Sequence, residues 1–511
     1  MVNESLFIHN SLFIVHHSQF LMLDWLAYRS QASPQKVGLI FGERRWTYQE
    51  LNEAVALLCG QLAAAGVQLG QHVAVLLSNC PEYVYVTHAL ARLGATLVPL
   101  NTRLTGAELR WQVEQADCCF VLCANETEAT AAALNVQTLN VQTFKPSNLP
   151  TAWLSRPLDL AAVQGLIFTS GTTGHPKGAM LTFYNLLWSA TASAFRLGTH
   201  PGDRWLACLP LYHVGGLSII FRCCLYGATL VLQPGFDPAA VSRALETQGI
   251  TLVSLVPTML HRLLESHPSS LTHSQLRCLL IGGAALSSRL LESCRALQLP
   301  IAATYGLTEA ASQVATALPA EVSRKPGSVG KPLMFSTVRI VDRHGQALPP
   351  GQIGEIVMHG PTVMAGYYRQ PEATAQTLRN GELYTGDLGY LDDEGDLWVV
   401  QRRADLIVSG GENVYPAEVE QVLQEHPAVA DACVVGLDDT EWGQRVAAVV
   451  VRRSQAQASA AELIAFCRTR LAGYKQPRLI HFTDALPQTA SGKVRRDAVR
   501  QQLALGIDAA D

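Results

Sequence analysis

Short apolar runs alternate with helical stretches along the first part of the chain. Residues 73–77 (VAVLL) form an uninterrupted apolar run, which is typical of a buried strand. A helical stretch follows over 81–92, with Pro81 suited to a first helical turn and Gly94 at its end. A second strand is predicted at 95–99. Strands that are apolar throughout and alternate with helices indicate a parallel sheet in an α/β fold.

One five-residue string, GATLV, occurs twice, at residues 94–98 and again at 227–231. Each copy follows a stretch with helical character. The repetition suggests that two similar α/β halves pack side by side in one large domain.

The segment 124–160 differs from its surroundings. It contains scattered prolines and a duplicated NVQT string at 135–138 and 140–143. We expect a surface loop or a poorly ordered segment there.

The pattern changes again after residue 335. The runs 338–341 and 354–358, with a turn at His344–Gly345 between them, are typical of antiparallel strands. They indicate a β-rich part that completes the large domain.

A polar break at 401–405 precedes a compact mixed unit. Pro416 begins a predicted helix, strands are predicted at 432–437 and 445–451, and another helix lies near 460–471.

The predicted fold is therefore α/β. It comprises a large N-terminal domain (22–400) of two packed α/β halves and a β-rich part, a hinge (401–405), and a small mobile α+β C-terminal domain (406–511).

Residues 1–21 contain an echo, SLFI at 5–8 and again at 11–14, and their only charge is Glu4. A signal peptide has early positive charge, and no apolar run is long enough to span a membrane. We expect a disordered extension or a start assigned too early, and no stable membrane insertion.

Composition excludes several functional classes. The net charge is −4, which does not favour a nucleic-acid partner. The 12 cysteines include no CxxC pair, so zinc binding is not predicted and buried thiols in a reducing cytoplasm are expected. Oligomeric state is left open.

A glycine- and hydroxyl-rich loop closed by a lysine, FTSGTTGHPKG at 168–178, carries the strongest chemical signal. Glycines let backbone N–H groups approach phosphate oxygens, and hydroxyls add donors. The alternative is a plain Gly/Thr-rich turn. The predicted phosphate-binding residues are Thr169, Ser170, Gly171, Thr172, Thr173, Gly174 and Lys177.

Five further motifs follow in order. They are LPLYHVGG (209–216), YGLTE (305–309), YTGD (384–387), RRADLIVSGGENVYP (402–416) and PQTASGK (487–493). With the phosphate loop, this set resembles the adenylate-forming superfamily of acyl-CoA synthetases, peptide-synthetase adenylation domains and luciferases. The resemblance runs from about residue 24 to 500. It implies that ATP activates a carboxylic acid as an acyl-adenylate, and that the acyl group then passes to the thiol of CoA.

The resemblance also implies roles for individual residues. Glu309 would be the Mg²⁺ ligand, as suits a carboxylate oxygen. Thr308 would contact the α-phosphate, and Asp387 the ribose hydroxyls. The remaining nucleotide-site residues are Tyr305 against adenine, Gly306 in the same motif, Gly283 in the GGAAL loop (282–286), and Arg402 on ribose or phosphate.

The small domain is expected to act in two orientations. Lys493 would bridge carboxylate and α-phosphate during adenylation, and Gly410 and Gly411 would line the pantetheine channel afterwards. Many superfamily members carry Asp or Lys where Ala404 stands and Gly where Gln401 stands, so the true pivot is left open.

His213 has two interpretations: it borders the acyl pocket and contacts the acid or controls its entry, or it is an aromatic-lined core histidine. The motifs as a group look most like those of o-succinylbenzoate–CoA ligases of menaquinone synthesis. Gln313 and Thr316 would then border a polar acid pocket. Further candidates for its carboxylate are Ser287, Ser288 and Arg222.

Three alternatives remain. The enzyme acts on another aryl or medium-chain acid, it loads a carrier protein rather than CoA, or the chain is a binding protein without activity. The last would be expected to lose Lys493, Glu309 or the phosphate loop, and all are present.

Overall fold

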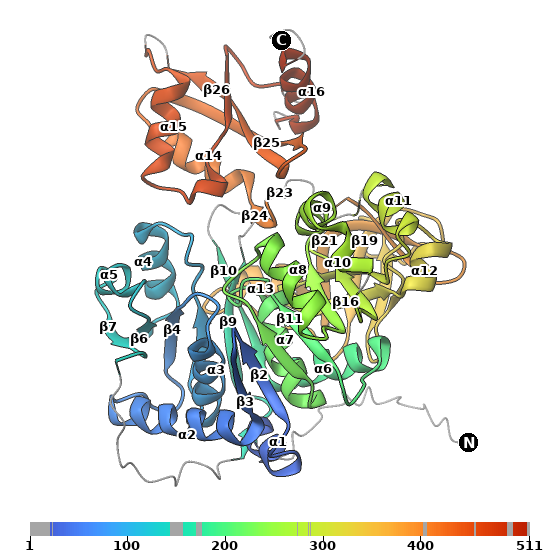
Figure 1. Cartoon of the computed structure of the whole chain (residues 1–511). Helices are drawn as coiled ribbons and strands as arrows, with labels where there is room; N and C mark the ends of the chain where they lie inside the picture. Colours follow the sequence, from blue (N-terminus) through green and yellow to red (C-terminus); the bar gives the residue numbers. More distant parts are fainter. Residues whose placement is uncertain are drawn as a thin grey trace, which may run out of the picture.

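The computed structural model describes residues 21–22, 24–143, 157–169, 176–272, 274–284, 286, 288–401, 406–453, 456–487 and 494–507. The chain forms a large body and a smaller lobe, which is drawn at the top of Figure 1. Residues 1–20, to which the predicted extension belongs, and 402–405, most of the predicted hinge, lie outside this description.

A six-stranded sheet forms the first half of the large body, in the order β10-β9-β5-β4-β6-β7. Its inner pairs are parallel, and β10 closes one edge antiparallel to β9. The strands are β4 (His72–Leu76), β5 (Thr96–Pro99), β6 (Cys118–Cys123), β7 (Gln137–Asn140), β9 (Val163–Thr169) and β10 (Lys177–Thr182), and the neighbouring helices are α2 (Tyr48–Ala64), α3 (Pro81–Leu93), α4 (Gly106–Gln115) and α5 (Glu128–Ala132).

A nine-stranded sheet forms the second half, in the order β17-β16-β15-β14-β13-β11-β12-β2-β3. Its strands are β2 (Val37–Phe41), β3 (Arg44–Thr47), β11 (Arg204–Ala207), β12 (Thr229–Leu232), β13 (Leu252–Leu255), β14 (Cys278–Ile281), β15 (Ile301–Leu307), β16 (Ser312–Ala317) and β17 (Lys331–Pro332). Its helices are α6 (Phe183–Leu197), α7 (Val214–Tyr226), α8 (Pro238–Thr247), α9 (Pro257–Ser266), α10 (Pro268–Thr272), α11 (Ser288–Ala296), η2 (Thr308–Ala310) and α12 (Pro319–Arg324). Near the start of the chain lie α1 (Trp25–Ala32) and β1 (Leu21–Met22), the latter paired with β8 (Leu158–Asp159).

The two copies of GATLV occupy equivalent places in the two halves. Gly94 ends α3 at φ 68°, ψ 28°, and Gly227 ends α7 at φ 69°, ψ 29°. This left-handed conformation favours glycine, and each copy continues into a buried strand, β5 or β12. One buried cluster includes Val73 of the first sheet and Trp205 of the second. The prediction of two packed α/β halves is confirmed.

The expectation of a loop over 124–160 is wrong for part of that segment. Helix α5 and strand β7 lie there, and β7 extends the sheet in parallel with β6. Buried Ala131 and Leu134 anchor the pair. The strand was not predicted, because the duplicated NVQT string is largely polar and lacks the apolar pattern of a buried strand. Residues 144–156 are not described.

The β-rich part is a five-stranded antiparallel sheet. It contains β18 (Thr337–Val341), β19 (Gly354–His359), β20 (Leu378–Arg379), β21 (Glu382–Leu391) and β22 (Leu397–Gln401), with α13 (Pro371–Thr377) beside it. The predicted antiparallel strands and the turn at 344–345 are confirmed.

The small lobe packs helices against a second five-stranded sheet. Its strands are β23 (Ile407–Ser409), β24 (Glu412–Val414), β25 (Val429–Asp439), β26 (Gly443–Arg452) and β27 (Leu479–Thr483), and its helices are α14 (Pro416–Gln424), α15 (Ala460–Arg468), η3 (Gly473–Lys475) and α16 (Arg496–Ile507). The predicted helix near 460–471 ends earlier than expected, at Arg468.

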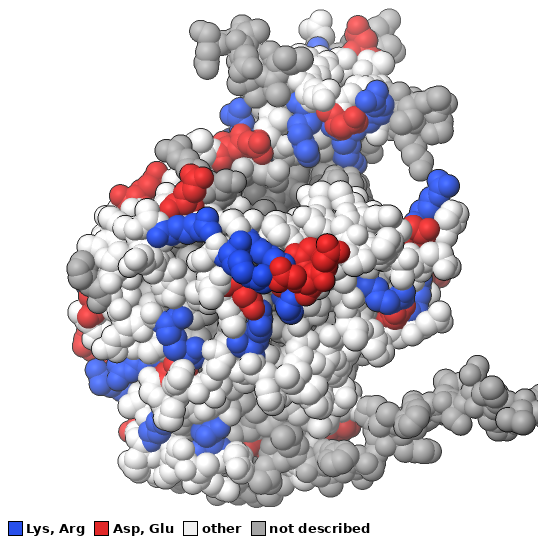
Figure 2. All heavy atoms as spheres, turned by 90° about the vertical axis from the view of Figure 1, so that its right-hand side faces the viewer, with Lys and Arg blue, Asp and Glu red and all other residues white. Residues whose placement is uncertain are grey.

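Charges of both signs are interspersed on the face that Figure 2 presents. After α12, Lys325 pairs with Asp392 at 2.7 Å and with Asp396 at 2.6 Å. Among the described residues, none of the helices has the length and apolarity needed to cross a bilayer.

Candidate active site

A cavity of about 310 Å³ lies between the large body and the small lobe. Its floor comes from the carboxyl ends of parallel strands β13, β14 and β15, a common place for ligands in α/β sheets. The small lobe adds lining residues from strand β24 and its two ends, between residues 410 and 415. Predicted site residues that line it are Thr169, His213, Arg222, Gly283, Gly306, Thr308, Glu309, Gln313, Asp387, Gly410 and Gly411.

Antiparallel pairing of β9 and β10 places Thr169 opposite Lys177. The two residues therefore stand at the two ends of the predicted phosphate loop. Ser170, Gly171, Thr172, Thr173 and Gly174, between them, lie outside the described residues. The Thr169 hydroxyl donates to Glu309 Oε1 at 3.4 Å, so the loop begins beside the predicted metal ligand.

Glu309 is buried on η2, directly after β15. Tyr367 Oη donates to its Oε1 at 2.8 Å, and the Lys177 ammonium lies 5.3 Å from the centre of the Tyr367 ring. No group of three metal-binding side chains occurs in the described part of the chain. A single carboxylate beside a phosphate loop fits Mg²⁺, which keeps several waters and takes phosphate oxygens as its other ligands.

Asp387, at the YTGD motif on β21, is buried at the cavity wall. Tyr305 Oη donates to its Oδ2 at 2.6 Å, which fixes the carboxylate's orientation. The Tyr305 ring packs against Ala310 and Val314 in a buried cluster.

Glycines of the two lobes meet across one side chain. A methyl group added at Gly283 would lie 3.1 Å from Val256 Cγ1, and one added at Gly411 would lie 3.1 Å from Val256 Cγ2. All three residues line the cavity. The absence of a side chain at Gly283 and Gly411 therefore lets both lobes approach Val256 closely at the cavity.

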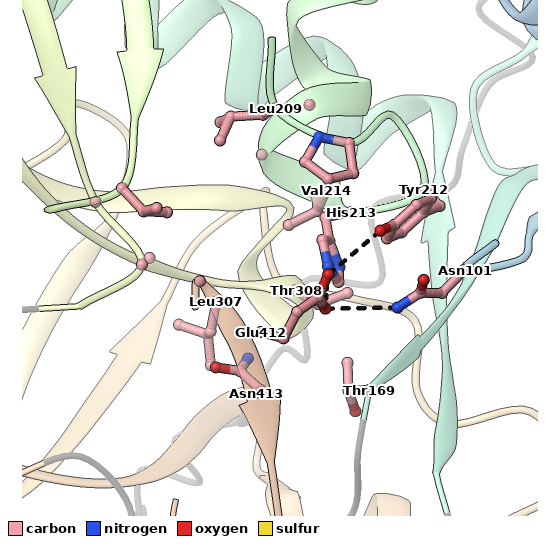
Figure 3. A pocket seen from close by; sticks show the side chains of 18 of the residues that line it. Asn101, Thr169, Leu209, Tyr212, His213, Val214, Leu307, Thr308, Glu412 and Asn413 are labelled. Atoms are coloured by element: carbon pink, nitrogen blue, oxygen red, sulfur yellow. Dashed lines mark hydrogen bonds and ion pairs between the residues drawn. The ribbon is translucent and has the colours of Figure 1, made fainter. Parts of the chain in front are cut away.

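His213 and Glu412 form the hub of a network between the lobes, shown in Figure 3. His213 Nε2 lies 2.9 Å from Glu412 Oε2, and Tyr212 Oη donates to Oε1 at 3.2 Å. Arg103 Nη1 donates to Oε1 at 3.1 Å, and Asn101 Nδ2 reaches Oε2 at 3.4 Å. The core interpretation of His213 does not describe this position, since the residue lines the cavity and is partly exposed.

Glu412 is only 3% exposed. Burial raises the pKa of its carboxyl group, but His213, Arg103 and the donated hydrogen bonds outweigh burial and lower that pKa to about 2. Glu412 was not among the predicted site residues, although it lies inside the GGENVYP motif. A lone carboxylate among glycines was the available signal.

Arg222 lies at the inner end of the cavity, on α7, and is 2% exposed. Its Nη2 reaches Ser312 Oγ at only 3.4 Å, and its Nε has no hydrogen-bond partner among the described residues. Its guanidinium lies 5.7 Å from the centre of the Trp205 ring. Burial lowers the pKa of the Arg222 guanidinium, because no carboxylate of the described chain compensates its charge.

The other residues predicted for the acid pocket differ in whether they reach the cavity. Gln313 lines the cavity and donates to Thr316 Oγ1 at 3.0 Å, while its own Oε1 has no hydrogen-bond partner among the described residues. Thr316 is buried behind Gln313. Ser287 and the side chain of Ser288 are not described, nor are Arg402 and Lys493.

Two family models match the chain: AMP-binding enzyme over residues 26–368, and AMP-binding enzyme C-terminal domain over 418–493. A 2-succinylbenzoate–CoA ligase of Bacillus cereus (strain Q1) is 42% identical over 480 residues, covering 94% of this chain and 98% of that protein.

Three solved structures of o-succinylbenzoate CoA synthetase from Bacillus subtilis also match. A double mutant bound to the product analogue OSB-NCoA has a TM-score of 0.89 at 41% identity, covering 93% of this chain and 97% of that one. The complex with the acyl-adenylate OSB-AMP scores 0.73 at 41% identity, covering 94% and 98%. The complex with ATP and magnesium scores 0.72 at 40% identity, covering 94% and 99%.

Identity and coverage hardly change among these three structures of one protein. This chain nevertheless superposes better on the product-analogue complex than on the other two. Matches over most of its length, together with the site geometry, show that this chain belongs to the AMP-binding enzyme family of adenylate-forming enzymes.

Proposed function

We propose that this chain is a 2-succinylbenzoate–CoA ligase of menaquinone synthesis. It would convert 2-succinylbenzoate, ATP and CoA into 2-succinylbenzoyl-CoA, AMP and diphosphate. The observation that carries the proposal is the buried Arg222 guanidinium, which lines the cavity without a carboxylate partner among the described residues. A monocarboxylic acid would leave this charge uncompensated, whereas a dicarboxylic acid brings a second carboxylate to pair with it.

In the first half-reaction, one carboxylate oxygen of the acid attacks the α-phosphorus of ATP. The bond to the β-phosphate breaks, and diphosphate leaves with the electron pair. Because the reacting groups are all negative, the site must hold them in line and neutralise charge. Lys177 and Thr169, with the loop between them, would hold the β- and γ-phosphates. Thr308 would contact the α-phosphate, and Lys493 would bridge it to the carboxylate.

Asp387 would accept hydrogen bonds from the ribose hydroxyls, in the orientation that Tyr305 imposes. Glu309 would hold Mg²⁺, which offsets the phosphate charge when bound. Arg402, Gly283 and Gly306 would complete the nucleotide site.

In the second half-reaction, the sulfur of CoA attacks the acyl carbon and loses its proton. The bond between the acyl carbon and the AMP oxygen then breaks. The thiol arm would reach this carbon between the two lobes, past Val256, Gly410 and Gly411. His213 is held by its contact with Glu412 and would leave this path open.

The acid is tested by supplying ATP, Mg²⁺ and CoA with a panel of acids, and measuring diphosphate and thioester together. The panel contains 2-succinylbenzoate, benzoate, a coumarate-type acid, octanoate and an amino acid. Selective thioester formation with 2-succinylbenzoate is expected. Turnover of another acid instead would keep the mechanism and refute the pathway, and diphosphate without thioester would point to a carrier-protein acceptor.

The described cysteines are free thiols, and all but two of them, Cys80 and Cys119, are buried. Thiols that need no oxidant support the further proposal that the enzyme works in a reducing cytoplasm.

A further inference from the structure

Lys475 lies in the contact between the large body and the small lobe, on η3. Its ammonium is 2.8 Å from Glu108 Oε1 on α4 of the large body. It is also 2.7 Å from Glu418 Oε1 on α14 of its own lobe. Figure 1 shows α4 at the upper edge of the large body, directly under the small lobe.

The three charged groups are removed from water. The exposed fractions of the side chains are 4% for Lys475, 13% for Glu108 and 11% for Glu418. Burial lowers the pKa of Lys475, but Glu418 and Glu108 together outweigh burial and raise it, so the lysine stays charged. Apolar residues of both lobes, Leu109 and Leu471 among them, belong to one buried cluster around this contact.

Each partner in this ion pair keeps a second partner inside its own lobe. Lys475 has Glu418, and Glu108 closes a capping box at the start of α4, where its Oε2 accepts from the Thr105 backbone N–H at 2.7 Å. If the lobes separate, Lys475 therefore keeps its ion pair with Glu418, and Glu108 keeps its hydrogen bond in the capping box. Such a contact suits two surfaces that form and break their interface in every catalytic cycle, because neither charged group loses all its partners.

We propose that Glu108 is a positioning residue for thioester formation: its ion pair with Lys475 holds the small lobe in the orientation in which the thiol reaches the acyl-adenylate. The inference rests on the proposed function. The domain arrangement supports it, because this chain superposes better on the relative's product-analogue complex than on its acyl-adenylate complex.

The test separates the half-reactions of the full-length enzyme. Glu108→Gln removes the charge but keeps the capping box, since Gln is accepted at that position. Enzyme is first loaded with acid and ATP, CoA is added in a rapid-quench apparatus, and thioester is followed over one turnover. We expect the thioester step to slow by about tenfold or more, and ATP–diphosphate exchange to stay within about twofold.

One matched variant separates the loss of this ion pair from a general change in the charge of α4. Glu114→Gln removes an exposed carboxylate from the same helix and is not expected to change the ratio of the two half-reaction rates. An unchanged thioester step in Glu108→Gln, or an equal loss in both half-reactions, would overturn the proposal.

Failure of the proposed function gives a different result. Wild-type enzyme that forms no thioester from 2-succinylbenzoate would refute that function. The same measurements are then made with the acid that the panel identifies, so the role of Glu108 is decided either way.

Discussion

The two ends of the cavity are built differently. The inner end, at Arg222, belongs to the large body alone, and its charge has no partner carboxylate in the described chain. The outer end, at Glu412, combines residues of both lobes, and its charge has several partners. A buried charge without a partner is suited to bind a ligand of opposite charge. A buried charge that already has partners is suited to hold the two lobes in one arrangement. The comparison indicates that the charge of Arg222 is available to a ligand, whereas the charge of Glu412 holds residues of the two lobes together.

The largest effect is expected for Lys493→Ala, which tests the contribution of the small lobe to adenylation. In the proposed mechanism this lysine would bridge the carboxylate and the α-phosphate while diphosphate leaves. Adenylation should fall by roughly 100- to 1000-fold. Thioester formation from preformed acyl-adenylate should fall far less, as measured by single-turnover quench. Equal loss in both steps would contradict the role assigned to Lys493.

Arg222→Gln tests the inner end. Removing the buried cation should lower kcat/KM for 2-succinylbenzoate by roughly 100-fold, because the second carboxylate loses its partner. Activity with benzoate, which has no second carboxylate, should change little or rise. Steady-state assays with both acids provide the comparison, and a parallel loss for the two acids would show that Arg222 does not read the second carboxylate.

Asp387→Ala tests the part of the site that the large body provides for the nucleotide. Loss of hydrogen bonds to a charged acceptor should weaken ATP use by about 1.5–3 kcal/mol, seen as a raised KM for ATP. Tyr305→Phe removes only the orienting hydrogen bond and should have a smaller effect in the same direction. Unchanged ATP dependence in Asp387→Ala would remove the ribose assignment.

The smallest effect is expected in acid. The pKa of Glu412 is lowered to about 2, so its contribution to stability is full above the ordinary carboxyl value near 4.5 and is lost as pH falls toward 2. Between pH 5 and 3.5, wild-type protein should lose about 1 kcal/mol more unfolding free energy than Glu412→Gln. Chemical denaturation at both pH values measures this, and parallel losses would mean that Glu412 is not paired in solution.

Much of the fold was predictable because its signals are local. Apolar strands, Pro81 at a helix start and the repeated glycine at helix ends each act within a few residues. The short strand β7 was missed because its sequence is polar and its support comes from β6.

The position of a residue at the cavity was predictable where a motif contains it, as for Glu309 and Asp387. Pairings between lobes were not predictable, because His213 and Glu412 are 199 residues apart and no local pattern links them. Glu108 illustrates the limit: its capping box can be read from Thr105 and the spacing, but its second partner, Lys475, is 367 residues away.

Val256 separates the large body from the small lobe at the cavity, since a Cβ added at Gly283 or at Gly411 would lie only 3.1 Å from one of its methyl groups. On the path proposed for the thiol, this one side chain therefore stands between glycines of both lobes. For enzyme engineering, substitutions at position 256 alone should therefore change the width of this path. Val256→Ala would widen the entrance for branched or bulkier acceptors, and Val256→Ile would narrow it against them, without altering the residues that choose the acid.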